Sequence, residues 1–209
     1  MATLRQQERR PRSDGLRSRR AILDAAIDLA TLEGLDGLSI GRLADQVGIS
    51  KSGLHAHFGS KEALQLATID EAAKRYERDV VRPGLAEPDP VARLVALCGN
   101  FLTYIEDDVF PGGCFFASVN AEFDTRPGPV RDVLIELQTA WLQELTKQYA
   151  DAQTAGLLVD PGEPEQSAFE INAYLHLAND LYVLYRDPVY IERGRRAIAA
   201  YLERHRPAV

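Results

Sequence analysis

The feature that most constrains the fold is residues 39–58, which the pattern predicts to be two short helices joined by a tight turn. Ser39 can cap the first helix, and Gly48 suits the left-handed backbone that would end it. Ser50 can cap the second helix, which ends near Phe58. Two helices joined in this way form a helix-turn-helix, a unit that places its second helix in the major groove of DNA.

The remaining sequence also shows helical periodicity. No alternating run of β-branched residues lies between hairpin turns, so strands are not expected. One helix is expected from Ser18 to the breaker Gly34, and another from Ser60 to about Val81, before the break "RPGLAEPDP". Further helices are expected at residues 90–107, 114–123, 129–155, 165–185 and 189–204. We therefore predict an all-α fold of about nine helices, with a three-helix N-terminal helix-turn-helix domain packed on a six-helix C-terminal domain.

The charges divide the chain in a similar way. Residues 1–61 carry ten Lys or Arg against seven Asp or Glu, whereas the remainder carries fourteen against twenty-four. A mildly basic head on an acidic body fits a polyanion-binding end, although the first dozen residues fit a solvated tail equally well. We expect a flexible basic arm at residues 1–15, a DNA-binding domain at 16–62, and a ligand-binding and dimerisation domain at 63–209.

Other classes of protein are disfavoured. No apolar run approaches the length of a membrane span, and the first residues show no secretory signal. The two cysteines, Cys98 and Cys114, fit a reduced compartment. His55 and His57 would point about 200° apart in a helix, so they cannot share a metal, and no third group orients them for catalysis. We expect a cytoplasmic protein that is not an enzyme, with no cofactor, no metal and no membrane contact.

The motif "SxxxLAxxVGISKSGLHAHFGSKEAL" closely resembles the DNA-binding signature of the TetR family of bacterial transcriptional regulators. The segment from "FPGGCFF" to "RPGPVR" also resembles a stretch that recurs in one branch of that family. One residue departs from the pattern, since the family usually has tyrosine where this chain has His55. The resemblance implies a homodimeric regulator, most commonly a repressor, that binds a near-palindromic double-stranded DNA operator and is released by a small, largely apolar effector.

The resemblance also places the residues that face DNA. They are mostly short polar or cationic side chains around the start of the second helix: Ser39, Arg42, Ser50, Lys51, Ser52, Gly53, Leu54, His55, His57 and Lys61. Lys61 would sit at a helix N-terminus, where the helix dipole also favours a phosphate. An alternative for His57 is a cap or a residue at the edge of the core.

An effector requires a cavity, and the middle helices carry aromatic side chains interspersed with a few polar ones. The candidate wall consists of Phe101, Tyr104, Cys114, Phe115, Phe116, Val119, Asn120, Phe123, Trp141, Leu145, Tyr174, His176 and Asn179. Aromatic residues at helical spacing are also typical of an ordinary core, so for each residue a core position is the alternative. The polar members need hydrogen-bond partners if buried, and a ligand can be one.

Cys114 leaves a second function open. It would lie near a helix N-terminus, where the pKa of a thiol is lowered. A thiol-based redox or electrophile sensor is therefore an alternative function. A small buried thiol with no chemical role is the simpler interpretation of Cys114. An enzyme that uses Cys114 as a nucleophile ranks last. An architectural DNA binder without a ligand is a further alternative.

The final pair of helices is the expected dimer surface, because the family uses its last two helices for this purpose. The candidate residues are Phe169, Ala173, Tyr182, Ile191, Ile198 and Tyr201. The alternative is that these side chains face only the core of the monomer.

Overall fold

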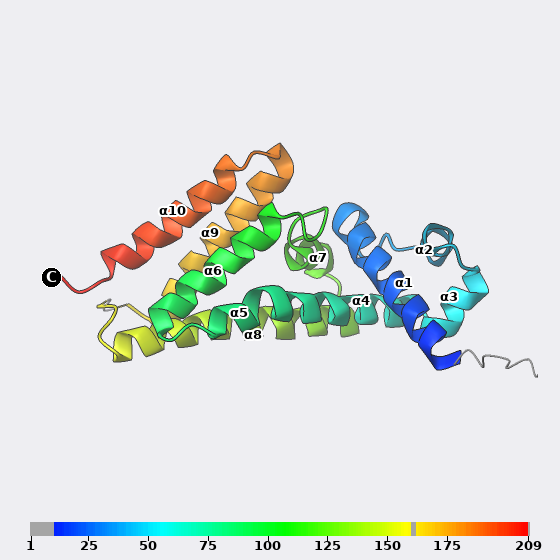
Figure 1. Ribbon diagram of the computed structural model, residues 1–209, viewed down its shortest axis with the longest axis horizontal. Helices are drawn as coiled ribbons and strands as arrows, with labels where there is room; N and C mark the ends of the chain where they lie inside the picture. Colours follow the sequence, from blue (N-terminus) through cyan, green and yellow to red (C-terminus); the bar gives the residue numbers. More distant parts are fainter. Residues whose placement is uncertain (1–10, 160–161, 209) are drawn as a thin grey trace, which may run out of the picture.

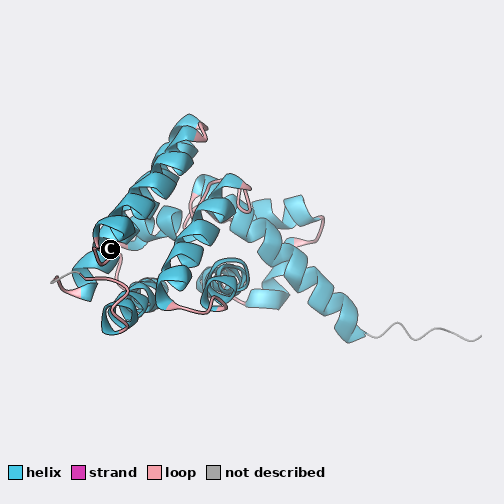
Figure 2. Cartoon of the chain, turned by 60° about the vertical axis from the view of Figure 1, so that its left-hand side comes forward, coloured by secondary structure: helices cyan, strands magenta, loops and turns pink. Residues whose placement is uncertain are grey.

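The structure of the 209-residue protein is a computed structural model that describes residues 11–159 and 162–208, with side chains from residue 15 onward. Figure 2 shows helices joined by loops, and none of the described residues forms a strand. The predicted all-α fold is confirmed.

Three helices form a head at one end of the molecule: α1 (Pro11–Glu33), α2 (Ile40–Val47) and α3 (Lys51–Phe58). In Figure 1 the head lies at the right, and α4 (Lys61–Tyr76) leads from it into the body. The body contains α6 (Pro90–Glu106), α7 (Phe115–Phe123), α8 (Pro129–Thr154), α9 (Pro164–Tyr185) and α10 (Val189–Arg204). The long α8 packs against α4, α6 and α9, while α9 packs against α10.

The predicted helix caps are confirmed. The hydroxyl oxygens of Ser39, Ser50 and Ser60 each accept the backbone N–H of the third residue along, at 3.0–3.1 Å. Gly48 follows α2 with a φ of 70°, in the left-handed region that glycine adopts without a steric penalty. Gly48 and the Ser50 cap together shape the turn between α2 and α3.

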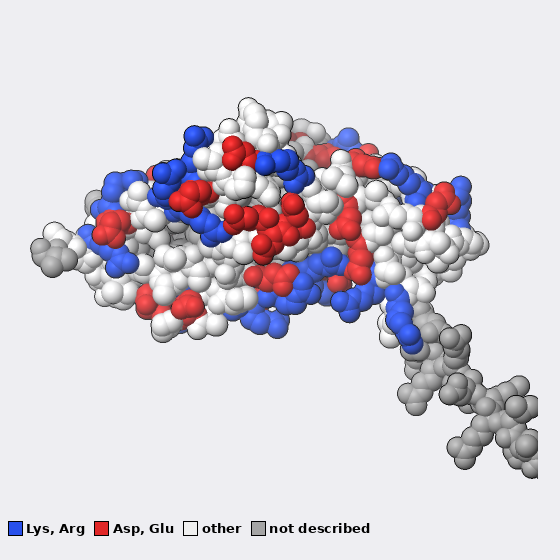
Figure 3. Space-filling model, turned by 45° about the horizontal axis from the view of Figure 1, so that its top comes forward, with Lys and Arg blue, Asp and Glu red and all other residues white. Residues whose placement is uncertain are grey.

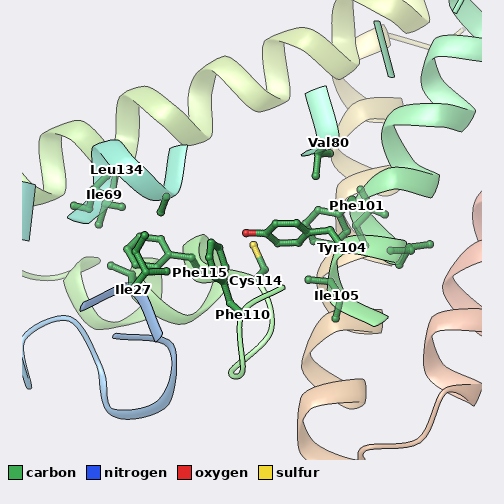
Figure 4. Close-up of a cluster of buried hydrophobic side chains, with 14 of the residues drawn as sticks. Ile27, Ile69, Val80, Phe101, Tyr104, Ile105, Phe110, Cys114, Phe115 and Leu134 are labelled. Carbon is green, nitrogen blue, oxygen red and sulfur yellow. The ribbon is translucent and has the colours of Figure 1, made fainter. Parts of the chain in front are cut away.

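One hydrophobic core joins the head to the body. Figure 4 shows Ile27 of α1 and Ile69 of α4 beside Phe115 of α7 and Leu134 of α8. All four side chains are buried in one cluster that continues through the body. The head is therefore packed on the body rather than tethered to it.

The structure corrects two predicted boundaries. The chain is already helical at Pro11, so the predicted arm at residues 1–15 overlaps α1, and its first ten residues lie outside the described ranges. The predicted helix end at about Val81 is also too early, because α4 continues through the π-helical turn η1 (Glu77–Val81) and through α5 (Arg82–Leu85). The break itself lies at residues 86–89, inside the predicted segment.

The π-helical turn explains why Pro83 does not end this helix. The Arg82 N–H donates to the Glu77 carbonyl, five residues earlier, so the hydrogen-bond pattern restarts there. Pro83 then occupies the first turn of α5, where its missing N–H is not needed. When α4, η1 and α5 are counted as one, the described ranges contain nine helices, as predicted.

Candidate nucleic-acid interface and effector cavity

Most of the predicted DNA-facing residues lie exposed together at the tip of the head. Around the start of α3 the exposed ones are Ser39, Arg42, Ser50, Lys51, Ser52, His55 and Lys61, while Gly53 and His57 are half-buried. Leu54 is the exception. The prediction that it faces DNA is corrected, because its side chain is fully buried in the core of the head. The predicted set without Leu54 thus forms one polar surface.

Lys51 is positioned by a residue that the sequence did not single out. A Cβ on Gly41 would come within 3.0 Å of Lys51 Cε and 3.1 Å of its Nζ. The lysine side chain therefore lies across the place where any other residue at position 41 would project. Gly41 lets the ammonium reach along α2, on the exposed side of the head.

Two other cations of this surface, Arg42 and Lys61, are ion-paired within the protein. Arg42 contacts Glu33, and Lys61 Nζ lies 2.9 Å from Asp36 Oδ1. Arg126 of the body lies 2.7 Å from the other oxygen of Asp36, and hydrogen bonds from Lys61 and Arg126 lower the pKa of that carboxyl. These pairs are solvent-exposed and contribute little stability, so a phosphate can compete for Lys61.

Charge is not uniform over the molecule. Figure 3 shows acidic side chains gathered across the middle of one face, with basic side chains below them and toward both ends. A polyanion lying across the middle of this face would therefore meet acidic groups.

The head is held by a carboxylate from the body. Glu122 of α7 accepts the backbone N–H groups of Leu35 and Asp36, at 2.7 and 2.8 Å. Gly34 makes this possible, since its φ is 87° and a Cβ there would come 2.9 Å from Glu122 Oε1. The sequence indicated Gly34 only as the end of a helix. We call Glu122 and these three head residues the α1–α7 joint.

A second contact supports the same end of α1. The N–H of Gly112, in the loop before α7, donates to Thr31 Oγ1 at 3.2 Å. A Cβ on Gly112 would come 2.1 Å from the Thr31 carbonyl oxygen, so only glycine fits. The loop and α7 therefore both hydrogen-bond to the C-terminal end of α1 from the body side.

A cavity of about 250 Å³ lies in the body beside the last turn of α4. Tyr76, the final residue of α4, meets the rings of Phe101, Tyr104, Phe116 and Trp141 edge-on, with ring centroids 5.4–6.3 Å apart. This arrangement is favoured by the quadrupoles of the rings. The aromatic cluster around Tyr76 forms the inner side of the cavity.

Part of the predicted wall lies at this cavity. Of the predicted set, the residues that line it are Phe101, Cys114, Phe116, Trp141 and His176. The wall also contains residues that the prediction missed: Ala73, Tyr76, Glu77, Val81, Leu137, Gln138, Ala140 and Glu144. Leu137 and Glu144 flank Trp141 on one face of α8 at helical spacing, so the spacing around Trp141 could have indicated them.

The other predicted wall residues have different roles. Buried core positions not on the cavity surface are held by Tyr104, Phe115, Val119 and Leu145. Asn120 and Phe123 line a separate hollow between α7 and α8. Tyr174 packs on the ring of Tyr201, and Asn179 Oδ1 accepts the N–H of Cys114 at 2.9 Å. None of these eight residues lines the cavity, and their contact with a ligand stays a prediction.

Burial keeps the interior of the body uncharged. It raises the pKa of Cys114 to about 11, although the backbone N–H groups of Ala117 and Phe116 lower it. Burial also raises the pKa of Tyr76 and Tyr104 and lowers that of His176. The expected low pKa of Cys114 is thus wrong, because desolvation of the thiolate outweighs the helix N-terminus.

The exposed apolar surface of the last two helices lies on α9. Phe169, Leu177 and Leu184 are 64%, 57% and 69% exposed, and Ala173 lies between the first two on the same face. The prediction that the other four residues form a dimer surface is corrected, because these side chains are buried in the monomer: Tyr182, Ile191, Ile198 and Tyr201. We call Phe169, Ala173, Leu177 and Leu184 the α9 stripe.

Two other kinds of site are absent from the described residues. Within residues 11–159 and 162–208, no three His, Cys, Asp or Glu side chains are grouped so that they could hold a metal ion. Over the same ranges, no helix combines the length and the apolar character needed to cross a membrane.

Comparison with known proteins gives matches over both parts of the chain. The family model of the tetracyclin repressor-like C-terminal domain matches residues 90–198, and that of the bacterial regulatory proteins of the tetR family matches residues 22–68. The HTH-type transcriptional repressor AcnR of Corynebacterium efficiens is 37% identical over 70 residues, which are 34% of this chain and 37% of that protein. The chain therefore matches well under half the length of this relative.

Two solved structures share the fold. A TetR transcriptional regulator from Chloroflexus aurantiacus J-10-FL has a TM-score of 0.86 at 24% identity, covering 94% of this chain and 100% of that one. AibR, in complex with isovaleryl coenzyme A and operator DNA, has a TM-score of 0.72 at 20% identity, covering 88% and 97% of the two chains.

The raised thiol pKa values predict that the cysteines are unreactive in the folded protein. With a pKa of about 11, Cys114 has a thiolate fraction on the order of 10⁻⁴ at neutral pH. Iodoacetamide should leave both cysteines unmodified in the native protein and alkylate both in urea, as read by intact mass. Cys98, whose pKa burial raises to about 12, is the internal control. Rapid alkylation of Cys114 alone in the native protein would contradict this and favour a thiol sensor.

Proposed function

Since the chain belongs to the TetR family of bacterial transcriptional regulators, whose C-terminal domain model alone matches more than half of it, we propose that it is a homodimeric repressor. It binds a near-palindromic DNA operator in the cytoplasm and is released by a small effector. The observation that carries this proposal is the exposed polar surface around the start of α3. Support for repression comes from the match of 70 of its residues to the repressor AcnR.

The α3 surface suits the major groove in both shape and charge. Serine side chains at the start of α3 leave room for close approach, and Lys51 supplies a cation beside them. Phosphate contacts would set the position of the helix, while the side chains along it reach the bases. Lys61 would leave Asp36 for a phosphate when the head docks, because the pair that holds it is exposed.

The α9 stripe supports a dimer. Its three large apolar side chains are each more than half exposed, which is costly for a monomer in water. Packing the stripes of two copies against each other would bury them across a two-fold axis. A dimer is also what a helix-turn-helix needs, since one head reads only a half-site.

Two helices can carry a signal from the cavity to the head. α4 begins at the Lys61–Asp36 pair and ends at Tyr76 in the cavity wall. α7 begins beside Cys114 and Phe116 in the same wall and carries Glu122 of the α1–α7 joint. A ligand that binds one arrangement of these helices better than the other shifts the population of the two, and thereby the spacing of the heads.

The alternatives are less well supported. A thiol sensor needs an accessible thiolate, whereas Cys114 is buried with a raised pKa. A purely architectural DNA binder has no use for an aromatic cavity in its body.

The proposed phosphate contacts predict a weaker salt dependence of DNA binding in two variants. Lys51→Ala and Lys61→Ala should each lower the affinity for an operator selected from random duplexes. Each should also make the negative slope of log K against log salt shallower by about 0.9, because one fewer counterion is released. Lys147→Ala removes an exposed lysine on α8, outside the head, and should leave the slope unchanged. Wild-type slopes in both head variants would refute the contacts.

The α9 stripe predicts where a charge breaks the dimer. Leu177→Glu should convert the protein to monomer in sedimentation velocity and weaken operator binding at least about tenfold, since each head then binds alone. Leu32→Glu, at a leucine of α1 that is 59% exposed, is the matched control and should stay dimeric. A Leu177→Glu protein that remains dimeric would move the interface to another surface.

A further inference from the structure

Three aromatic rings in contact with one another line the cavity. The rings of Phe101 and Trp141 stack with centroids 6.4 Å apart and an interplanar angle of 24°. Tyr76 stands nearly perpendicular to both, at 73° and 83°. The face of an aromatic ring carries partial negative charge and attracts a cation within about 6 Å of its centroid.

The formal charges of the wall are negative. Glu77 and Glu144 line the cavity, and no Lys or Arg of the described chain lines it with them. Since burial lowers the pKa of His176, its imidazole stays neutral at physiological pH. An anionic ligand would therefore meet two carboxylates and no cation.

Glu77 differs from its neighbours in having no cationic partner. In the part of the chain that the structure describes, its side chain makes no ion pair or hydrogen bond, whereas Asp79 is paired with Arg78 and Asp70 with Lys74. Glu144 accepts a hydrogen bond from the neutral amide of Gln148 at 2.6 Å. Both carboxylates of the wall thus keep an uncompensated charge.

A buried hydroxyl gives a second, independent sign of a ligand. Tyr104 is 3% exposed, and its hydroxyl has no hydrogen-bond partner among the described residues. Figure 4 shows this oxygen directed toward the sulfur of Cys114, which lines the cavity. Because a desolvated hydroxyl is costly when unpaired, a polar atom of a bound molecule would be its natural partner.

We propose that the effector is a compact organic cation with an apolar body, whose charge is held between Glu77, Glu144 and the aromatic rings. The inference rests on the proposed function, because it names the class of molecule that releases the DNA. A volume of about 250 Å³ is just below the range of about 300–1,000 Å³ for drug-sized ligands, so the molecule is small.

The experiment compares three probes of nearly equal size and different charge: phenyltrimethylammonium, its neutral isostere tert-butylbenzene, and benzoate. Trp141 is the only tryptophan of the chain and lies in the cavity wall, so its fluorescence reports occupancy in the full-length protein. The ammonium should bind at least about tenfold more tightly than tert-butylbenzene, and benzoate should bind more weakly than either.

Variants test which groups hold the charge. Glu77→Gln and Glu144→Gln should each weaken binding of the ammonium several-fold, and the double variant at least about tenfold, while tert-butylbenzene binds within about twofold of wild type. Glu136→Gln is the matched control, since it removes the same charge from an exposed site on α8 outside the cavity. Near-UV circular dichroism confirms that each variant is folded.

The possible results test the proposed class of ligand separately from the proposed function as a regulator. Equal binding of tert-butylbenzene and the ammonium, unchanged binding in the double variant, or no quenching by millimolar ammonium each overturns the proposal. If selective operator binding persists in those cases, the protein remains a regulator with another class of effector. Failure of the wild-type protein to select any operator contradicts the proposed function instead.

Discussion

The carboxylate of Glu122 fixes the head on the body, and the proposed coupling between DNA and the cavity depends on it. It accepts two backbone N–H groups at the end of α1, a charge-assisted arrangement stronger than neutral hydrogen bonds. Glu122 belongs to α7, and the second residue of α7, Phe116, lines the cavity. A ligand that displaces α7 must therefore move the end of α1 or break these bonds. Gly34 allows the close approach, so the joint is specified by the backbone as well as by charge.

α4 reaches the same place by another route. Its first residue, Lys61, pairs with Asp36, and Asp36 also pairs with Arg126 of the body. Its last residue, Tyr76, stands at the centre of the aromatic cluster, where the helix changes to the π-helical turn. Such turns are frequent at functional sites because the hydrogen-bond pattern is locally rearranged. Asp36 is thus the point at which both helices, and a DNA phosphate competing for Lys61, meet.

The sequence predicted those parts of the molecule that local rules determine. α10 runs over Val189–Arg204 as predicted, and the serine caps of the head are where the motif placed them. Parts decided by distant neighbours were predicted less well. An apolar stripe shows that a residue is covered but not by what, so Ile198 was assigned to the dimer although it is buried in the monomer. Glu122 contacts residues 86 and 87 positions away, and no local pattern of charge indicates such a contact.

The proposal as a whole requires that a ligand in the cavity lowers the affinity for DNA, and that DNA lowers the affinity for the ligand. Coupling between two binding sites is reciprocal, so the ligand must lose affinity in the operator complex by the factor by which it weakens operator binding. The direct test is the dissociation constant of phenyltrimethylammonium, read from Trp141 fluorescence, with and without saturating selected operator. We predict a loss of about 5–150-fold in the operator complex, equal to the loss of operator affinity at saturating ligand. The same affinity in both states would contradict the account.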